Sequence, residues 1–163
     1  MTATTSNLCL TQAPVAKAEM LIRKPPAEVF EAFVDPAITS RFWFTKGSGR
    51  LEPGRQVRWD WEMYGVSATV DVLAVEAFER IRISWPDDGG ATTVEWRFTP
   101  LGDDATFVSI ANGGFAGDDD NTVRQAIGAT EGFTLVLAGL KAWLEHGVAL
   151  NLVADRFPAG LER

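Results

Sequence analysis

Residues 118–147 read DDDNTVRQAIGATEGFTLVLAGLKAWLEHG and predict one long helix. No proline intervenes from Val123 to His146, which allows about six turns at 3.6 residues each. The three aspartates at the start suit the positive end of a helix, and Gly147 suits a C-terminal cap. An apolar stripe follows, formed by Phe133, Val136, Leu137, Leu140, Trp143 and Leu144. A helix with such a stripe must lie along an apolar surface.

The surface that can receive this helix is a series of short strands earlier in the chain. Between residues 55 and 110, apolar side chains recur at every second position, as in Val57, Trp59, Trp61 and Met63. This period is typical of antiparallel strands with one wet face. Turn residues separate the segments, most clearly at 86–90. The sequence therefore predicts an antiparallel meander whose inner face packs against the long helix.

Two kinds of element are expected before the meander. Residues 16–23 alternate as a first strand, which Pro25 and Pro26 end. Residues 27–33 then follow helical periodicity, and Asp35 and Pro36 open a second short helix that leads to an aromatic cluster at 42–44. We therefore expect an α+β fold with two short helices after strand 1 and the long helix near the end.

This order of elements and several local motifs resemble a known superfamily. The motifs are KPPAEVFEAFVDP at 24–36, the pair Phe42-Trp43, LEPG at 51–54, and EGF at 131–133 followed by Leu137, Leu140 and Leu144. They are similar to the START-like (SRPBCC) superfamily and, within it, to the branch named after the activator of the heat shock protein 90 ATPase, in its bacterial single-domain form. The resemblance covers nearly the whole chain, from about residue 16 to about residue 147.

The resemblance implies the helix-grip (START/Bet v-like) fold, in which a curved antiparallel β-sheet wraps around a long C-terminal α-helix. It divides the chain into a flexible tail at 1–15, the START-like domain at 16–147, and a C-terminal extension at 148–163 that packs on the domain. It also implies a cavity between sheet and helix. The superfamily includes lipid carriers, hormone receptors, polyketide cyclases and co-chaperones, so no single activity follows from the fold.

The composition narrows the classes of partner. The chain has 15 Lys+Arg against 22 Asp+Glu, a net charge of -7, which argues against nucleic acids and anionic membrane surfaces. Cys9 is the one cysteine, so an internal disulfide is excluded. The first residues lack the pattern of a secretion signal, and no apolar run approaches the ~18 residues that span a bilayer. We expect a cytoplasmic protein.

The ligand-binding candidates are side chains expected on the inner face of the sheet and on the facing helix. They are Trp59, Trp61, Trp85, Trp96, Phe98, Asn112, Phe133 and Leu137. Stiff indole rings on a concave face can bound a pocket, although the same residues can also form a simple aromatic core. Asn112, together with Tyr64, can offer a hydrogen bond inside the pocket, or it can begin a turn with Gly113.

Neither a metal site nor a cofactor is expected. His146 is the one histidine, and it falls at the C-terminal end of the helix, where the dipole favours a protonated imidazole. The acidic run at 118–120 lacks the spacing of a calcium loop and fits a helix start. No nucleotide, zinc or serine-hydrolase signature is present, so catalysis is left open and no catalytic residue is named.

Three glycines of the predicted helix, Gly128, Gly132 and Gly139, each weaken it by about 1 kcal/mol relative to alanine. Close approach of the helix backbone to the sheet or to the short helices explains such glycines. A helix contact in a homodimer, with Leu135 exposed, is the alternative. The segment at 148–157 is apolar and should fold back on the domain or meet a partner chain.

Three functions follow from these patterns. The first is binding of a small apolar or aromatic molecule between sheet and helix. The second is a protein-interaction module related to the co-chaperones, and the third is an enzyme of the cyclase type. Eukaryotic co-chaperones of this branch also carry a separate N-terminal domain that these residues do not supply, so we favour the small ligand over a chaperone partner.

Overall fold

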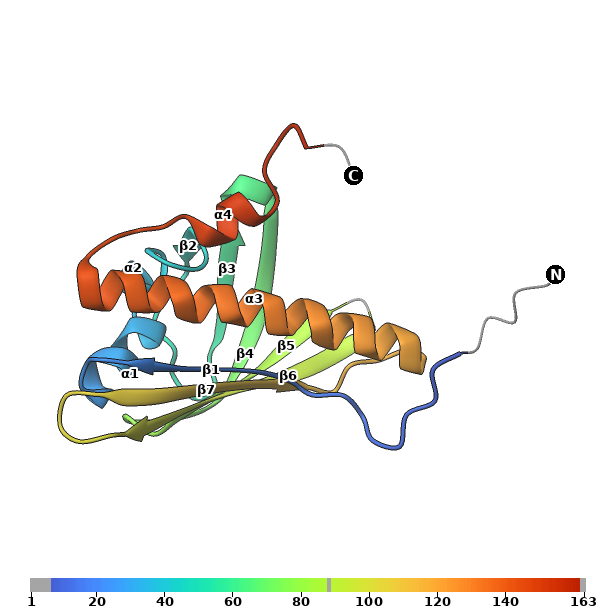
Figure 1. Cartoon of the computed structure of the whole chain (residues 1–163), viewed down its shortest axis with the longest axis horizontal. Coiled ribbons are helices and arrows are strands. Elements are labelled where there is room, and N and C mark those ends of the chain that lie inside the picture. Colours follow the sequence, from blue (N-terminus) through green and yellow to red (C-terminus); the bar gives the residue numbers. More distant parts are fainter. Residues whose placement is uncertain (1–6, 88, 162–163) are drawn as a thin grey trace.

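The computed structural model describes residues 7–87 and 89–161. One antiparallel sheet of seven strands, in the order β1-β7-β6-β5-β4-β3-β2, curves around the longest helix (Figure 1). The strands are β1 (Ala16–Ile22), β2 (Lys46–Gly47), β3 (Gln56–Trp61), β4 (Val66–Glu76), β5 (Arg80–Asp87), β6 (Gly90–Pro100) and β7 (Thr106–Gly113). Each strand from β2 to β6 pairs with the next along the chain, and the sheet is completed by pairing of β7 with β1.

Among the described residues, four α-helices and one short 3-10 turn accompany the sheet. They are α1 (Pro26–Val34), α2 (Pro36–Thr39), η1 (Glu62–Tyr64), α3 (Asp119–His146) and α4 (Leu152–Arg156). Helix α3 runs beside β1 and β7, with α1 and α2 near its C-terminal end, while α4 lies on the side of α3 away from β1 (Figure 1). This is the helix-grip fold expected from the sequence.

The alternating pattern of the strands sorts their side chains onto two faces. Along β7 every second residue is buried, from Thr106 to Asn112, and β6 buries the alternate positions from Thr92 to Phe98. Met63 departs from the expected pattern, because β3 ends at Trp61 and the 3-10 turn η1 redirects the chain, which leaves Met63 exposed. The inner face and the apolar stripe of α3 form one continuous core.

The two ends of α3 are fixed by local interactions. The Asp118 carboxylate accepts a hydrogen bond from the Asn121 backbone N–H at 2.8 Å, and Gly147 ends the helix with a left-handed φ of 66°. Near the C-terminal end, Lys141 donates to the Leu21 carbonyl of β1 at 2.8 Å and to Glu145 at 2.7 Å. These contacts hold the last turns of α3 against the first strand.

The ends of the chain are only partly described. Residues 1–6 of the predicted tail lie outside the described residues, but the backbone N–H groups of Leu8 and Leu10 bond the carboxylates of Asp120 and Asp119 at 3.1 and 2.8 Å. Among the residues that the structure describes, no helix combines the length and the apolar character needed to cross a bilayer.

Candidate functional site

A cavity of about 450 Å³ opens beside the N-terminal half of α3. We call it the α3 cavity. Its walls come from the ends of β5, β6 and β7, from the side of α3 that faces α4, from α4 itself, and from Trp43 and Tyr64. These segments are far apart in the sequence, and the fold brings them together because α3 covers β1 and β7 and leaves part of the sheet uncovered.

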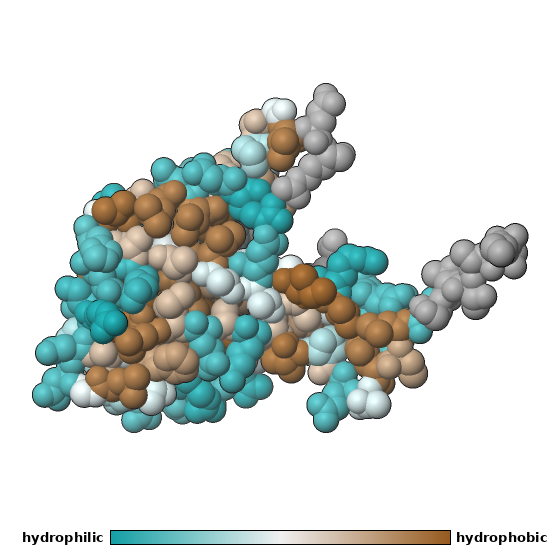
Figure 2. Space-filling model, viewed as in Figure 1, coloured by the Kyte–Doolittle hydropathy of each residue, from teal (hydrophilic) through white to brown (hydrophobic). Residues whose placement is uncertain are grey.

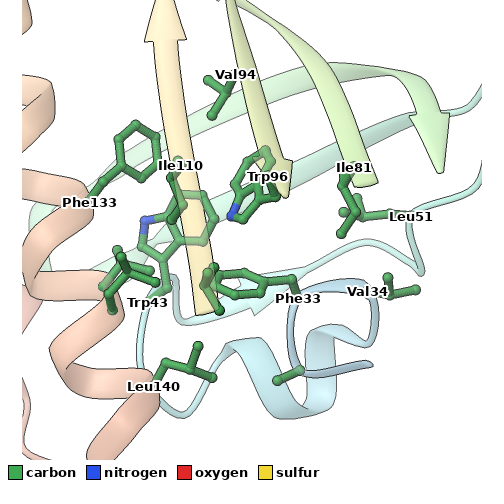
Figure 3. Close-up of a cluster of buried hydrophobic side chains, with 14 of the residues drawn as sticks. Phe33, Val34, Trp43, Leu51, Ile81, Val94, Trp96, Ile110, Phe133 and Leu140 are labelled. Carbon is green, nitrogen blue, oxygen red and sulfur yellow. The ribbon is translucent and has the colours of Figure 1, made fainter. Parts of the chain in front are cut away.

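Aromatic rings form one wall of the α3 cavity. Trp43, which follows α2, lies with its ring centroid 6.0 Å from that of Trp85 on β5 and 5.9 Å from that of Phe133 on α3. In Figure 3, Trp43 is seen between Phe133 and Trp96, and its centroid is 6.1 Å from that of Trp96. Such rings present flat apolar faces on which a planar ligand can stack.

Helix α3 contributes two glycines to the cavity wall, beside residues that carry side chains. A Cβ atom built at Gly128 or at Gly132 would have no other group within 4 Å, and both glycines border the cavity. Gly139 is different, because its Cβ would lie 3.2 Å from the Cβ and from the carbonyl oxygen of Phe42. The close approach expected for the helix glycines is therefore confirmed at Gly139, whereas Gly128 and Gly132 border open space.

Two buried polar side chains lie in the wall formed by the sheet. The Asn112 Nδ2 donates to the Thr93 carbonyl at 3.0 Å, and the Thr92 hydroxyl donates to the Trp85 carbonyl at a long 3.5 Å. Asn112 belongs to β7 and is paired with Val94 and Ala16, so the turn considered for it begins later, at Gly114 with a φ of 85°. On α3, the Gln125 Nε2 donates to the Ala116 carbonyl at 2.8 Å.

The short helix α4 closes one side of the α3 cavity. The Tyr64 hydroxyl donates to the Val153 carbonyl, and the Ala154 carbonyl lies 3.1 Å away. Arg156 forms an ion pair with Glu131 of α3, and this hydrogen bond raises the pKa of the guanidinium. Phe157 packs on Tyr64 with ring centroids 6.0 Å apart. These contacts join α4 to α3 and to η1.

Three of the eight ligand-binding candidates from the sequence border the α3 cavity, namely Trp85, Asn112 and Phe133. The other five, Trp59, Trp61, Trp96, Phe98 and Leu137, are buried in the core and do not border it. The rings of this second group pack against other rings of the core, as in the stacked pair Phe44–Trp59 with centroids 5.0 Å apart. Binding by any of the eight stays a prediction.

Other wall residues were not among the candidates, chiefly Trp43, Phe115, Gly128, Gly132 and Arg156. The spacing of the two glycines, four residues apart on one helix, was a signal in the sequence that pointed to this wall. Leu135, considered for a dimer contact, is half-buried and borders the cavity. His146 is exposed in the last turn of α3. Within residues 7–87 and 89–161, no cluster of three metal-ligating side chains is found.

Several solved structures of other proteins are similar to this chain in fold. Protein SSP2350 from Staphylococcus saprophyticus is 31% identical, with 84% of this chain and 96% of that chain covered and a TM-score of 0.74. Protein MLL2253 from Mesorhizobium loti is 20% identical over 83% of this chain and 99% of that chain, with a TM-score of 0.72. The Aha1 dimer from Colwellia psychrerythraea is 14% identical over 82% and 98%, with a TM-score of 0.70.

A comparison with curated proteins found no match. A sequence model of one family, described as Activator of Hsp90 ATPase homolog 1-like protein, matches residues 23–145. The matched region runs from the end of β1 to the last turn of α3 and so contains most of the sheet and the helix-grip arrangement. The chain therefore belongs to the family of Activator of Hsp90 ATPase homolog 1-like proteins.

Proposed function

We propose that this protein binds a small apolar or aromatic molecule in the α3 cavity. The observation that carries the proposal is the pair Gly128 and Gly132, which border a cavity of about 450 Å³ and have no neighbour where their Cβ atoms would be. Each glycine weakens the helix by about 1 kcal/mol relative to alanine. Both glycines are exposed, and the absence of side chains there leaves the cavity open along this part of α3.

The size and the lining of the cavity support this function. Pockets for small organic ligands are typically about 300–1,000 Å³, mostly apolar, with a few polar groups that orient the ligand. Here Trp43, Trp85 and Phe133 supply aromatic faces, while Asn112 and Thr92 supply polar groups at the sheet. Burial of the ligand's apolar surface would provide most of the binding free energy.

The proposal is tested by filling the cavity. We expect the wild-type protein to bind one molecule of 2-naphthol in equilibrium dialysis, and Gly132→Leu to weaken that binding by at least about tenfold, because the new side chain occupies the ligand's space. Thr134→Leu adds the same side chain on the same helix at an exposed position outside the cavity wall, and it should bind like the wild type. Equal binding by Gly132→Leu and the wild type would overturn the proposal.

A chaperone partner is the second candidate. The family description names activation of the Hsp90 ATPase, and the C-terminal extension exposes apolar side chains, among them Val148 and Leu150. Figure 2 shows apolar surface over the segment that joins α3 to α4. An increase in Hsp90 ATPase activity on addition of the purified protein, lost in the double variant Val148→Ser and Leu150→Ser, would favour this candidate.

A further inference from the structure

We infer, on the basis of the proposed ligand binding, that the ligand is an uncharged aromatic molecule that donates a hydrogen bond, from a hydroxyl or an N–H group, to Oδ1 of Asn112. This goes beyond the binding of an apolar molecule, because it names the group that the ligand must carry and the atom that recognises it.

The orientation of the Asn112 amide is set by the sheet. Its Nδ2 donates to the Thr93 carbonyl at 3.0 Å, which directs the amide nitrogen toward β6 and leaves Oδ1 as the remaining polar atom. No hydrogen bond to Oδ1 is found among the described residues. The side chain is only 6% exposed, and its residue borders the α3 cavity.

The residues directly opposite Asn112 offer no partner for Oδ1. The residues opposite it on the two neighbouring strands are Ala16 and Val94, which have no polar side-chain atoms. Among the described residues, the buried side-chain polar atom without a partner is the Trp96 indole nitrogen, so Asn112 Oδ1 is still reached by solvent in the cavity, and a ligand donor would replace water there. The cavity thus favours a ligand with a donor at the sheet end.

Most other polar side chains of the wall have already used their donors. The Thr92 hydroxyl donates to the Trp85 carbonyl, the Gln125 amide to the Ala116 carbonyl, and the Tyr64 hydroxyl to the Val153 carbonyl. The indole N–H groups of Trp43 and Trp85 remain, and they can donate to the oxygen of a ligand hydroxyl. A hydroxyl, which both donates and accepts, suits this set of groups.

The charges of the cavity wall favour an uncharged ligand. The charged side chains that line the cavity are those of Arg156 and Glu131, which form an ion pair with each other. An anionic ligand would have to take Arg156 away from Glu131, which would leave the Glu131 carboxylate beside the ligand's own negative charge. A cationic ligand would have to take Glu131 away from Arg156, which would leave the guanidinium beside the ligand's own positive charge. The cavity therefore favours neither an anionic nor a cationic ligand.

The inference is tested with three ligands of nearly the same shape. Naphthalene has no polar group, 2-methoxynaphthalene accepts but cannot donate a hydrogen bond, and 2-naphthol does both. We expect the wild-type protein to bind 2-naphthol about 3- to 10-fold more tightly than 2-methoxynaphthalene in equilibrium dialysis, which is the factor that one net hydrogen bond contributes. Asn112→Leu, which keeps the approximate volume and removes the amide, should abolish this preference while naphthalene still binds.

Matched variants separate the roles of the polar groups. Ser109→Ala removes a hydroxyl from the same strand, β7, at a position outside the cavity wall, and it should keep the preference for 2-naphthol. Asn112→Val, whose β-branched side chain suits a strand, replaces Asn112→Leu if the leucine variant does not fold. The comparison of the three ligands on the wild-type protein needs no variant at all.

Each outcome is decisive. Equal binding of 2-naphthol and 2-methoxynaphthalene by the wild type, or a preference that survives in Asn112→Leu or is lost in Ser109→Ala, would overturn the inference and leave the proposed function standing. Failure of all three ligands to bind the wild type would count against the proposed function, and the inference would fall with it.

Discussion

At the scale of single residues, two polar side chains have different roles: Asn112 is buried, and Glu145 is partly buried. Asn112 bonds the Thr93 carbonyl and borders the α3 cavity, whereas Glu145 bonds Lys141 and the backbone N–H of Arg23 and ties α3 to β1. The sequence marked Asn112 as a candidate through its place in the alternation but left open whether it begins a turn. Its register opposite Val94 and Ala16 places it in β7.

Glu145 makes stability depend on pH. Burial raises the pKa of its carboxyl, but the hydrogen bonds from Lys141 and from the Arg23 backbone outweigh burial, so the net pKa is lowered. A carboxyl whose pKa is lower in the folded than in the unfolded state stabilises the fold above the unfolded-state pKa, and that stabilisation is lost as pH falls through the folded-state pKa.

We expect Glu145→Gln to lower the free energy of unfolding by about 1–3 kcal/mol at pH 7, measured by urea denaturation. The difference from the wild type should shrink as pH falls from 7 toward about 3, since the wild-type carboxyl then becomes protonated. Glu28→Gln, in the exposed pair Lys24–Glu28 at 3.8 Å, is the control and should change stability by less than about 1 kcal/mol. A difference that stays constant with pH would contradict this role of Glu145.

At the scale of elements, α3 serves two purposes along its length. Its C-terminal half packs closely on the core, with Leu137 and Leu140 almost fully buried and Gly139 against Phe42. Its N-terminal half borders the α3 cavity with Gly128 and Gly132. The helix itself was predictable because its periodicity is strong and its capping residues are local. Tertiary packing decides which of the three glycines lies against another segment, so the sequence could not show that Gly139 does and that Gly128 and Gly132 do not.

The three glycines should respond differently to alanine. We expect Gly128→Ala and Gly132→Ala each to raise the free energy of unfolding by about 1 kcal/mol, because alanine favours the helix and no group lies within 4 Å of the new Cβ. Gly139→Ala should instead lower it, since the Cβ would be 3.2 Å from two atoms of Phe42. Urea denaturation of the three variants measures whether the free energy of unfolding rises or falls in each. A change of the same sign in the free energy of unfolding of all three variants would contradict the claim that Gly139 packs against Phe42 while Gly128 and Gly132 border open space.

At the scale of the whole molecule, the fold was predictable and the position of the cavity was not. The strands of the meander and the long helix follow from periods of two and 3.6 residues that are visible in short windows, and the helix-grip arrangement was implied by the resemblance to the superfamily. The cavity depends on where segments distant in the sequence meet, such as Trp43 after α2, the glycines of α3, and α4. Alternation showed that Trp59 and Trp96 face inward, but it did not show that other aromatic rings would enclose them completely.

The central claim is that the α3 cavity holds a small aromatic molecule, and a crystal structure of the wild-type protein with 2-naphthol tests it most directly. We expect the naphthalene ring to lie between the glycines of α3 and the rings of Trp43, Trp85 and Phe133, with its hydroxyl about 2.5–3.0 Å from Asn112 Oδ1. Side chains that interlock and leave no space beside Gly128 and Gly132, or 2-naphthol bound only elsewhere on the protein, would contradict the claim.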